Sequence, residues 1–194
     1  MADCLRLNTD YFTGSLGLRG AKGGLCMLLL FSGMTAVAQE RRVVPNEPHQ
    51  LFYLNRDPDN NTVVYQLNLE DGEVDADQPV NVYWIRYAEG GERQELTFVQ
   101  RKMAYGVSHK AMPDGGFELR LAAYKDHPLW LAYSKKEKRY RVYTTITGRQ
   151  AVLERIYVRI DGGSMLNPNI LYIELIGYDT ATKERISEQV KPDK

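Results

Sequence analysis

Hydrophobic and polar residues alternate with a period of two along most of the chain that follows Gln50. Such alternation is typical of β-strands with one buried face. The clearest alternating segments are 63–69, 80–85, 117–121, 140–146, 156–160 and 171–175, with shorter candidates at 51–54, 129–133 and 185–190. Because turn sequences rich in Asp, Asn, Pro and Gly separate these segments, the pattern predicts a mainly β fold, either an antiparallel β-sandwich or a small β-barrel.

One segment, residues 92–104, breaks the alternation. Its apolar residues Leu96, Val99 and Met103 recur at helical spacing, with acidic residues in the first turn and basic residues in the last. We therefore expect one α-helix packed on the sheet, although the run 96–99 is also compatible with a strand.

The N-terminal residues 1–38 are typical of a secretory signal peptide. Arg19 and Lys22 precede an apolar run, and the small residues Ala36 and Ala38 follow it. The run is shorter than the about 20 apolar residues of a stable membrane span, so none is expected after cleavage. We expect cleavage after Ala38 and a periplasmic or secreted protein. The stretch before the run is longer than usual, which favours a translation start downstream of Met1.

Beyond the cleavage site, the chain is expected to hold an extended leader, residues 39–49, and a single β-rich domain, residues 50–192. The leader is polar and contains Pro45 and Pro48. The domain is long enough to close a hydrophobic core of its own.

Composition excludes several kinds of chemistry from the secreted part. Both cysteines, Cys4 and Cys26, lie in the signal peptide, so a disulfide or a thiolate site is excluded. The whole chain has a formal net charge of +0, which offers no electrostatic footprint for nucleic acid. The single basic run, residues 135–141, is interpreted as a solvated hairpin loop.

No catalytic or metal motif emerges from the spacing of reactive residues. The three histidines, His49, His109 and His127, are not spaced as local zinc ligands, and no GxSxG or SxxK motif occurs. We therefore expect no catalytic residue, no metal site and no cofactor. His49 and His127 are assigned to the solvated leader and a turn, whereas His109 lies in a polar segment that follows the expected helix.

A ligand site is predicted at Trp84, Arg86, Tyr105 and His109. Arg86 alternates in phase with the apolar face of its strand, and a buried arginine must be paired. Its candidate partners are Glu118, Glu174 or an anionic ligand, with a carboxylate of the protein favoured. A second face rich in tyrosine suits either packing or the binding of a sugar or peptide.

Four sequence blocks carry a family resemblance. They are Tyr83-Trp84-Ile85-Arg86-Tyr87, the run from Arg101 to Val107, Arg155-Ile156-Tyr157-Val158, and Tyr172-Ile173-Glu174-Leu175 with Gly177. They resemble a family of secreted bacterial proteins known only as a domain of unknown function, over nearly all of residues 50–192. The resemblance implies a bacterial envelope setting and a self-contained domain, and it assigns a role to no residue.

These observations are compatible with three functions. The leading one is a non-catalytic exported β-domain that binds a small molecule or an envelope protein. The first alternative is a calycin-like barrel that carries a small apolar ligand. The second is an envelope hydrolase that uses His109 with a distant carboxylate.

Overall fold

The computed structural model describes residues 43–58, 60–164 and 167–191. All of them belong to one compact unit, Glu40–Lys194. The expected signal peptide, residues 1–38, lies outside the described residues.

Strands make up most of this unit, which confirms the prediction of a mainly β fold. They are β1 (Gln50–Arg56), β2 (Thr62–Leu67), β3 (Leu69–Glu70), β4 (Glu73–Val74), β5 (Val80–Arg86), β6 (Glu92–Glu95), β7 (Val107–Ala111), β8 (Phe117–Leu121), β9 (Tyr124–Ser134), β10 (Arg139–Ile146), β11 (Arg149–Gly163), β12 (Pro168–Asp179) and β13 (Arg185–Val190). The helical segments are η1 (Tyr87–Glu89), α1 (Phe98–Gln100) and η2 (Arg101–Tyr105).

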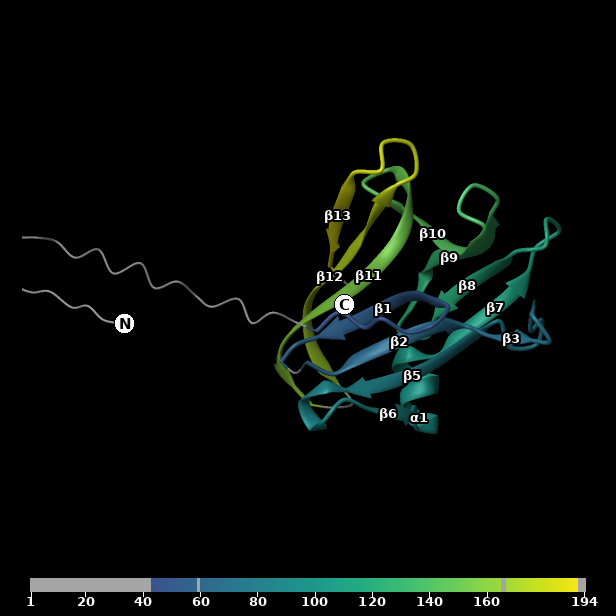
Figure 1. Cartoon of the computed structure of the whole chain (residues 1–194). Helices are drawn as coiled ribbons and strands as arrows, with labels where there is room; N and C mark the ends of the chain where they lie inside the picture. Colours follow the sequence, from purple (N-terminus) through teal and green to yellow (C-terminus); the bar gives the residue numbers. More distant parts are fainter. Residues whose placement is uncertain (1–42, 59, 165–166, 192–194) are drawn as a thin grey trace, which may run out of the picture. The chain divides into compact units, whose positions relative to one another are not determined.

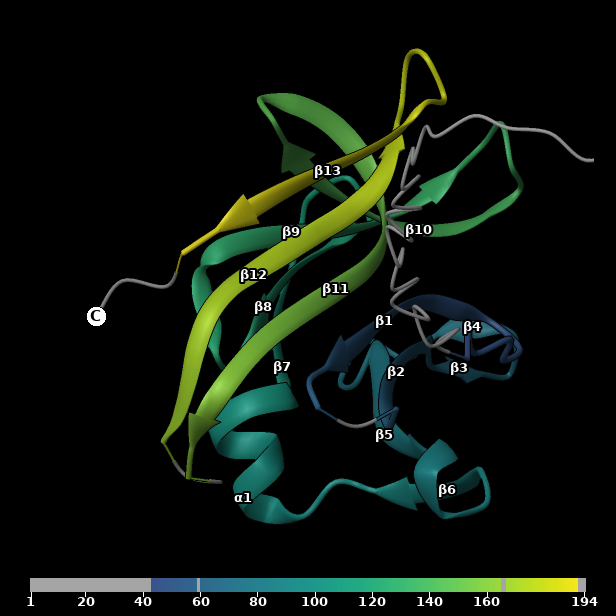
Figure 2. The same ribbon diagram turned by 90° about the vertical axis from the view of Figure 1, so that its left-hand side faces the viewer.

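Eleven strands form one sheet that curls into a half-barrel (Figure 1), so of the two architectures expected, the fold is closer to the barrel. The strand order is β6-β5-β2-β1-β11-β10-β9-β8-β7, with β12 and β13 added beside β11. The neighbouring strands are antiparallel except for β1 and β11, which are parallel. Figure 2 shows β11 and β12 as long curved strands side by side, with β13 along the other edge of β12.

Strand β11 is the branch point of the sheet. On one edge its first part pairs with β10 and its later residues Arg155–Val158 pair with β1, while β12 runs along the other edge. A register shift between Leu153 and Arg155 lies where the strand passes from one partner to the next. Such bulges increase local twist, which suits a strand that joins two arms of a curled sheet.

The inner face of the half-barrel carries the main hydrophobic core. Residues of alternating position from most strands meet there, as binary patterning requires. The rings of Phe52 and Tyr65 stack with centroids 4.2 Å apart, and the Tyr65 hydroxyl donates to the backbone oxygen of Tyr105 (3.0 Å). Fully buried inner-face residues include Val63, Leu119, Leu131, Val142, Ile146 and Leu175.

A smaller cluster of Val64, Tyr83 and Ile85 lies on the opposite face of β2 and β5. The described part of the expected leader packs close by, because the Tyr83 hydroxyl donates to a Glu47 carboxylate oxygen (3.4 Å) and Pro45 is buried. Burial, together with the Glu47 charge, raises the pKa of Tyr83 to about 12. Residues 43–49 thus pack on the domain through specific contacts.

The boundaries expected for the helix are wrong. Residues 92–95 form strand β6, which pairs with β5, and the helical segment covers only Phe98–Tyr105. Thr97 begins it through a capping box: its side chain accepts from the amide of Gln100 (3.3 Å), and the Gln100 side chain accepts from the amide of Thr97 (2.9 Å).

The apolar face expected to pack this helix is also different in the structure. Leu96 is buried but precedes the helix, whereas Val99 and Met103 are exposed, as is Phe98. Helical spacing of apolar residues therefore did not mark a buried face. The segment lies at one end of the half-barrel in both views (Figures 1 and 2).

Candidate functional site

Two of the residues predicted to bind a ligand, Trp84 and Tyr105, meet on the inner face. Their rings make an edge contact with centroids 5.0 Å apart. The guanidinium carbon of Arg56 lies 5.4 Å from the Trp84 ring centroid and 6.0 Å from that of Tyr105. These distances are within the range of cation–π attraction.

Tyr105 reaches this position because the chain turns tightly behind it. Residues 101–105 form a π-helical turn closed by a hydrogen bond from the amide of Gly106 to the carbonyl of Arg101 (3.0 Å). A Cβ at Gly106 would overlap that carbonyl oxygen, so only glycine fits. The hydroxyl of Tyr65 then holds the Tyr105 backbone across the core.

Arg86 occupies the same face as Trp84, two residues further along β5. Leu54 pairs with Val63, which pairs with Trp84, so Arg56 and Arg86 each follow this cross-strand row by two residues. Both arginines therefore stand at the same end of the inner face. We call Arg56, Trp84, Arg86 and Tyr105 the arginine–aromatic cluster.

Arg86 is paired with a carboxylate, but the partner is neither Glu118 nor Glu174. Its guanidinium donates to Glu89 and to Gln94 (2.7 Å). Glu89 comes from the short η1 turn, which directly follows β5, so a local contact is available that strand alternation does not reveal. Glu118 is paired with Arg120 instead (2.7 Å).

In Trp84 and Arg86, one donor each has no acceptor among the described residues. The indole Nε1 of Trp84 is one, in a side chain that is only 5% exposed, and the Nε of Arg86 is the other. Buried donors are nearly always satisfied in proteins. Both atoms are buried, so each could bond only to an acceptor that enters the protein beside the Trp84 and Tyr105 rings.

His109 is not brought into the cluster. It lies on β7, an edge strand, and is exposed. It follows Tyr105 by four positions, which in extended chain is a distance of ~13 Å between Cα atoms. Its ring contacts Phe117 edge-on (centroids 6.0 Å apart), and it makes no hydrogen bond or ion pair with another residue that the structure describes.

His127 differs from its expected place in a solvated turn. It lies within β9, is half-buried, stacks on Tyr124 (centroids 5.1 Å apart) and has its Nε2 2.6 Å from the hydroxyl oxygen of Thr144. Burial lowers its pKa. A turn was expected because Pro128 follows His127. This proline instead lies at a strand position outside the paired register, where no backbone N–H donor is needed.

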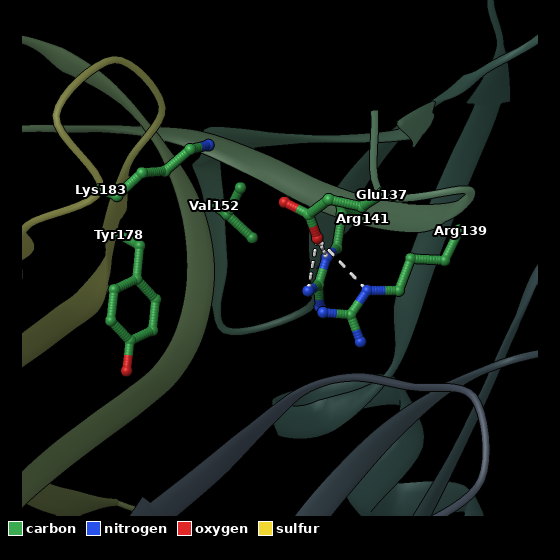
Figure 3. A pocket seen from close by; sticks show the side chains of 6 residues that line it. All are labelled: Glu137, Arg139, Arg141, Val152, Tyr178 and Lys183. Atoms are coloured by element: carbon green, nitrogen blue, oxygen red, sulfur yellow. Dashed lines mark hydrogen bonds and ion pairs between the residues drawn. The ribbon is translucent and has the colours of Figure 1, made fainter. Parts of the chain in front are cut away.

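A second candidate site is an open hollow of about 600 Å³ on the outer face (Figure 3). Lys183 and Tyr178 lie on one side of it and Glu137, Arg139 and Arg141 on the other, with Val152 between them. The sequence predicts a solvated loop at residues 135–141. That holds for the exposed turn 135–138, but Arg139 and Arg141 belong to β10.

The phase of β10 is the signal that could have revealed this hollow. Val142 and Thr144 are fully buried on the inner face, so Arg139 and Arg141 face outward. Strand phase also places Arg56 on the inner face, because it follows the buried residues Phe52 and Leu54 at intervals of two. No pattern in the sequence indicates that Lys183, which lies in a distant turn, lines the same hollow.

Neither a membrane helix nor a metal cluster emerges from the described residues. No helix among residues 43–58, 60–164 and 167–191 is long and apolar enough to cross a bilayer. Within the same ranges, His, Cys, Asp and Glu side chains form no group of three or more that could hold a metal ion.

Comparison with known proteins identifies the family. The chain belongs to the family described as domain of unknown function DUF4833, which residues 52–189 match. The suspected membership in a family without assigned activity is thereby confirmed. No curated protein and no solved structure matches the chain.

Proposed function

We propose that this chain is an exported, non-catalytic binding domain that holds a small molecule bearing a carboxylate at the arginine–aromatic cluster. The observation that carries the proposal is the pair of buried donors, Trp84 Nε1 and Arg86 Nε, that find no acceptor among the described residues. A carboxylate supplies acceptors on two oxygens. The Trp84 and Tyr105 rings would contact the apolar part of such a ligand.

The two alternative functions receive less support from the geometry. An apolar carrier needs an enclosed apolar cavity, whereas the outer hollow is open and lined mainly by charged residues. A hydrolase built on His109 needs a carboxylate within hydrogen-bonding reach of the ring. His109 makes no hydrogen bond or ion pair within the described part of the chain.

The fluorescence of Trp84 tests the proposed site directly. The chain has two tryptophans, so Trp130→Phe leaves Trp84 as the only reporter. Benzoate is a suitable probe, because it combines a carboxylate with an aromatic ring. We expect a saturable change in emission that Arg86→Gln weakens about tenfold, the worth of one hydrogen bond to a charged group. Arg120→Gln, which removes a paired arginine of β8, should leave the change intact.

Two results would argue against this site. One is a benzoate response that is absent or does not saturate, and the other is equal weakening by Arg86→Gln and Arg120→Gln. Export is tested separately by cell fractionation and the intact mass of the recovered protein. A chain that begins at Gln39 in the periplasm or medium is expected, and an uncleaved cytosolic chain would contradict export while leaving the binding proposal standing.

A further inference from the structure

The outer hollow joins parts of the chain that are distant in sequence. The turn before β10 contributes Glu137, β10 contributes Arg139 and Arg141, and the turn between β12 and β13 contributes Lys183. The floor is formed by Val152 and Tyr178, which are directly paired across β11 and β12. Three cationic side chains thus converge over an apolar and aromatic floor (Figure 3).

Positive charge is in excess in this hollow. Glu137 is the single acid among the six lining residues, against two arginines and one lysine. The ammonium of Lys183 has no ion pair with a described residue. The hollow therefore carries a surplus of two positive charges, in a chain whose formal net charge is +0.

The turn that carries Lys183 is braced. The carboxylate of Asp179 accepts from the amides of Ala181 (2.8 Å) and Thr182 (3.1 Å) and pairs with Arg149 (3.2 Å). The two backbone hydrogen bonds hold the pKa of Asp179 below its usual range. Lys183 therefore projects from a preorganised turn, which lowers the entropic cost of binding.

Glu137 already acts as an internal ligand of the two arginines. One of its oxygens accepts from Nε (2.7 Å) and Nη2 (2.6 Å) of Arg141 and from Nε of Arg139 (3.3 Å). The Arg141 side chain is only 18% exposed, so its guanidinium is held in place. A guanidinium held this way presents paired donors to any carboxylate or phosphate that replaces Glu137.

We infer that this hollow is a binding site for the phosphate group of an organic molecule, with Glu137 as the internal carboxylate that the phosphate displaces. A phosphate monoester carries close to two negative charges at pH 7, which matches the surplus. Its organic part would rest on Tyr178 and Val152. This site is separate from the arginine–aromatic cluster and does not depend on the function proposed there.

Calorimetric titration of the full mature chain with glycerol 3-phosphate tests the inference. We expect saturable binding that Arg141→Gln and Lys183→Gln each weaken about tenfold, since each removes a charge-assisted contact. Glu137→Gln should tighten binding several-fold, because it removes the competing charge. A gain in affinity cannot result from misfolding, so this variant keeps the test valid if Arg141→Gln fails to fold.

Lys135→Gln is the matched control, because Lys135 lies in the same hairpin turn, is exposed and does not line the hollow. A second arm replaces the soluble phosphate with vesicles of phosphatidylglycerol, whose headgroup presents a phosphate on a lipid surface. Binding in either arm with the stated variant pattern supports the site and identifies the source of the phosphate. Absence of binding in both arms, equal loss in Lys135→Gln, or no gain in Glu137→Gln would overturn it.

Discussion

At the scale of single residues, Asp57 ties two distant strands together. Its carboxylate accepts from the Tyr157 hydroxyl (2.6 Å) and from the Arg159 guanidinium (2.6 Å), and the residue is almost fully buried. Tyr157 lies 100 residues later in the chain. The contact therefore fixes the end of β1 against β11 through side chains as well as through the backbone.

Replacing Asp57 by alanine is expected to destabilise the domain by about 2–3 kcal/mol, because a buried hydroxyl then lacks its acceptor. Urea unfolding followed by circular dichroism measures the change. Asp161→Ala, which removes an exposed carboxylate from the same strand β11, is the control and should stay within about 0.5 kcal/mol of wild type. Equal losses in the two variants would contradict the role given to Asp57.

His127 makes stability depend on pH. Its pKa is lowered in the folded state by burial, so the unfolded chain binds the proton more readily. Stability is then unaffected well above the ordinary pKa of 6.5 and falls as the pH drops below it. The slope from this one group is at most ~1.4 kcal/mol per pH unit.

Unfolding free energies measured between pH 7 and pH 5 test this dependence. His127→Gln is expected to reduce the loss of stability on acidification. His49→Gln serves as the comparison, because it removes a histidine that is exposed. An unaltered slope in His127→Gln would rule out His127 as its source.

At the scale of elements, the strands could be predicted from the sequence, but the residues at which the helix begins and ends could not. Alternation identifies strands because one face of each packs on the core. Whether residues 92–95 form a helix or a strand depends instead on the partner strand β5. The spacing of residues within the segment holds no information about that partner. Strand β9 is likewise longer than residues 129–133, because it continues through Pro128, which the sequence places in a turn.

Leu96 and Phe98 give a direct test of where the buried face ends. Leu96 is buried and part of the core cluster, whereas Phe98 is 75% exposed. Leu96→Ala is expected to cost about 2–5 kcal/mol and Phe98→Ala less than about 0.5 kcal/mol, both from urea unfolding. A cost of about 2 kcal/mol or more for Phe98→Ala would contradict a buried face that ends before the helix.

At the scale of the whole molecule, pairing order determines which parts open first. Strands β6, β7 and β13 each have one paired neighbour, whereas β11 has partners on both edges. We expect amides of β11 to exchange hydrogen only through global unfolding and those of the three edge strands to exchange through local opening. Native-state hydrogen exchange measures both, and uniform exchange across the sheet would contradict this order.

The candidate sites differ in the same way: residues of one strand can be grouped from the sequence, whereas contacts between distant segments cannot. Trp84 and Arg86 share a strand face, so alternation was enough to group them. Tyr105 lies beside Trp84, but His109 does not, because a strand of exposed residues follows the π-helical turn. The outer hollow depends on Lys183 reaching residues of β10, a contact that only the folded sheet defines.

The late position of β11 has a consequence for how the chain is made. Strand β1 is the first of the described strands to leave the ribosome, but its parallel partner β11 follows only after most of the domain. Until then the β1 edge is an open template for other chains. Truncated products that end before Arg155 are therefore expected to aggregate.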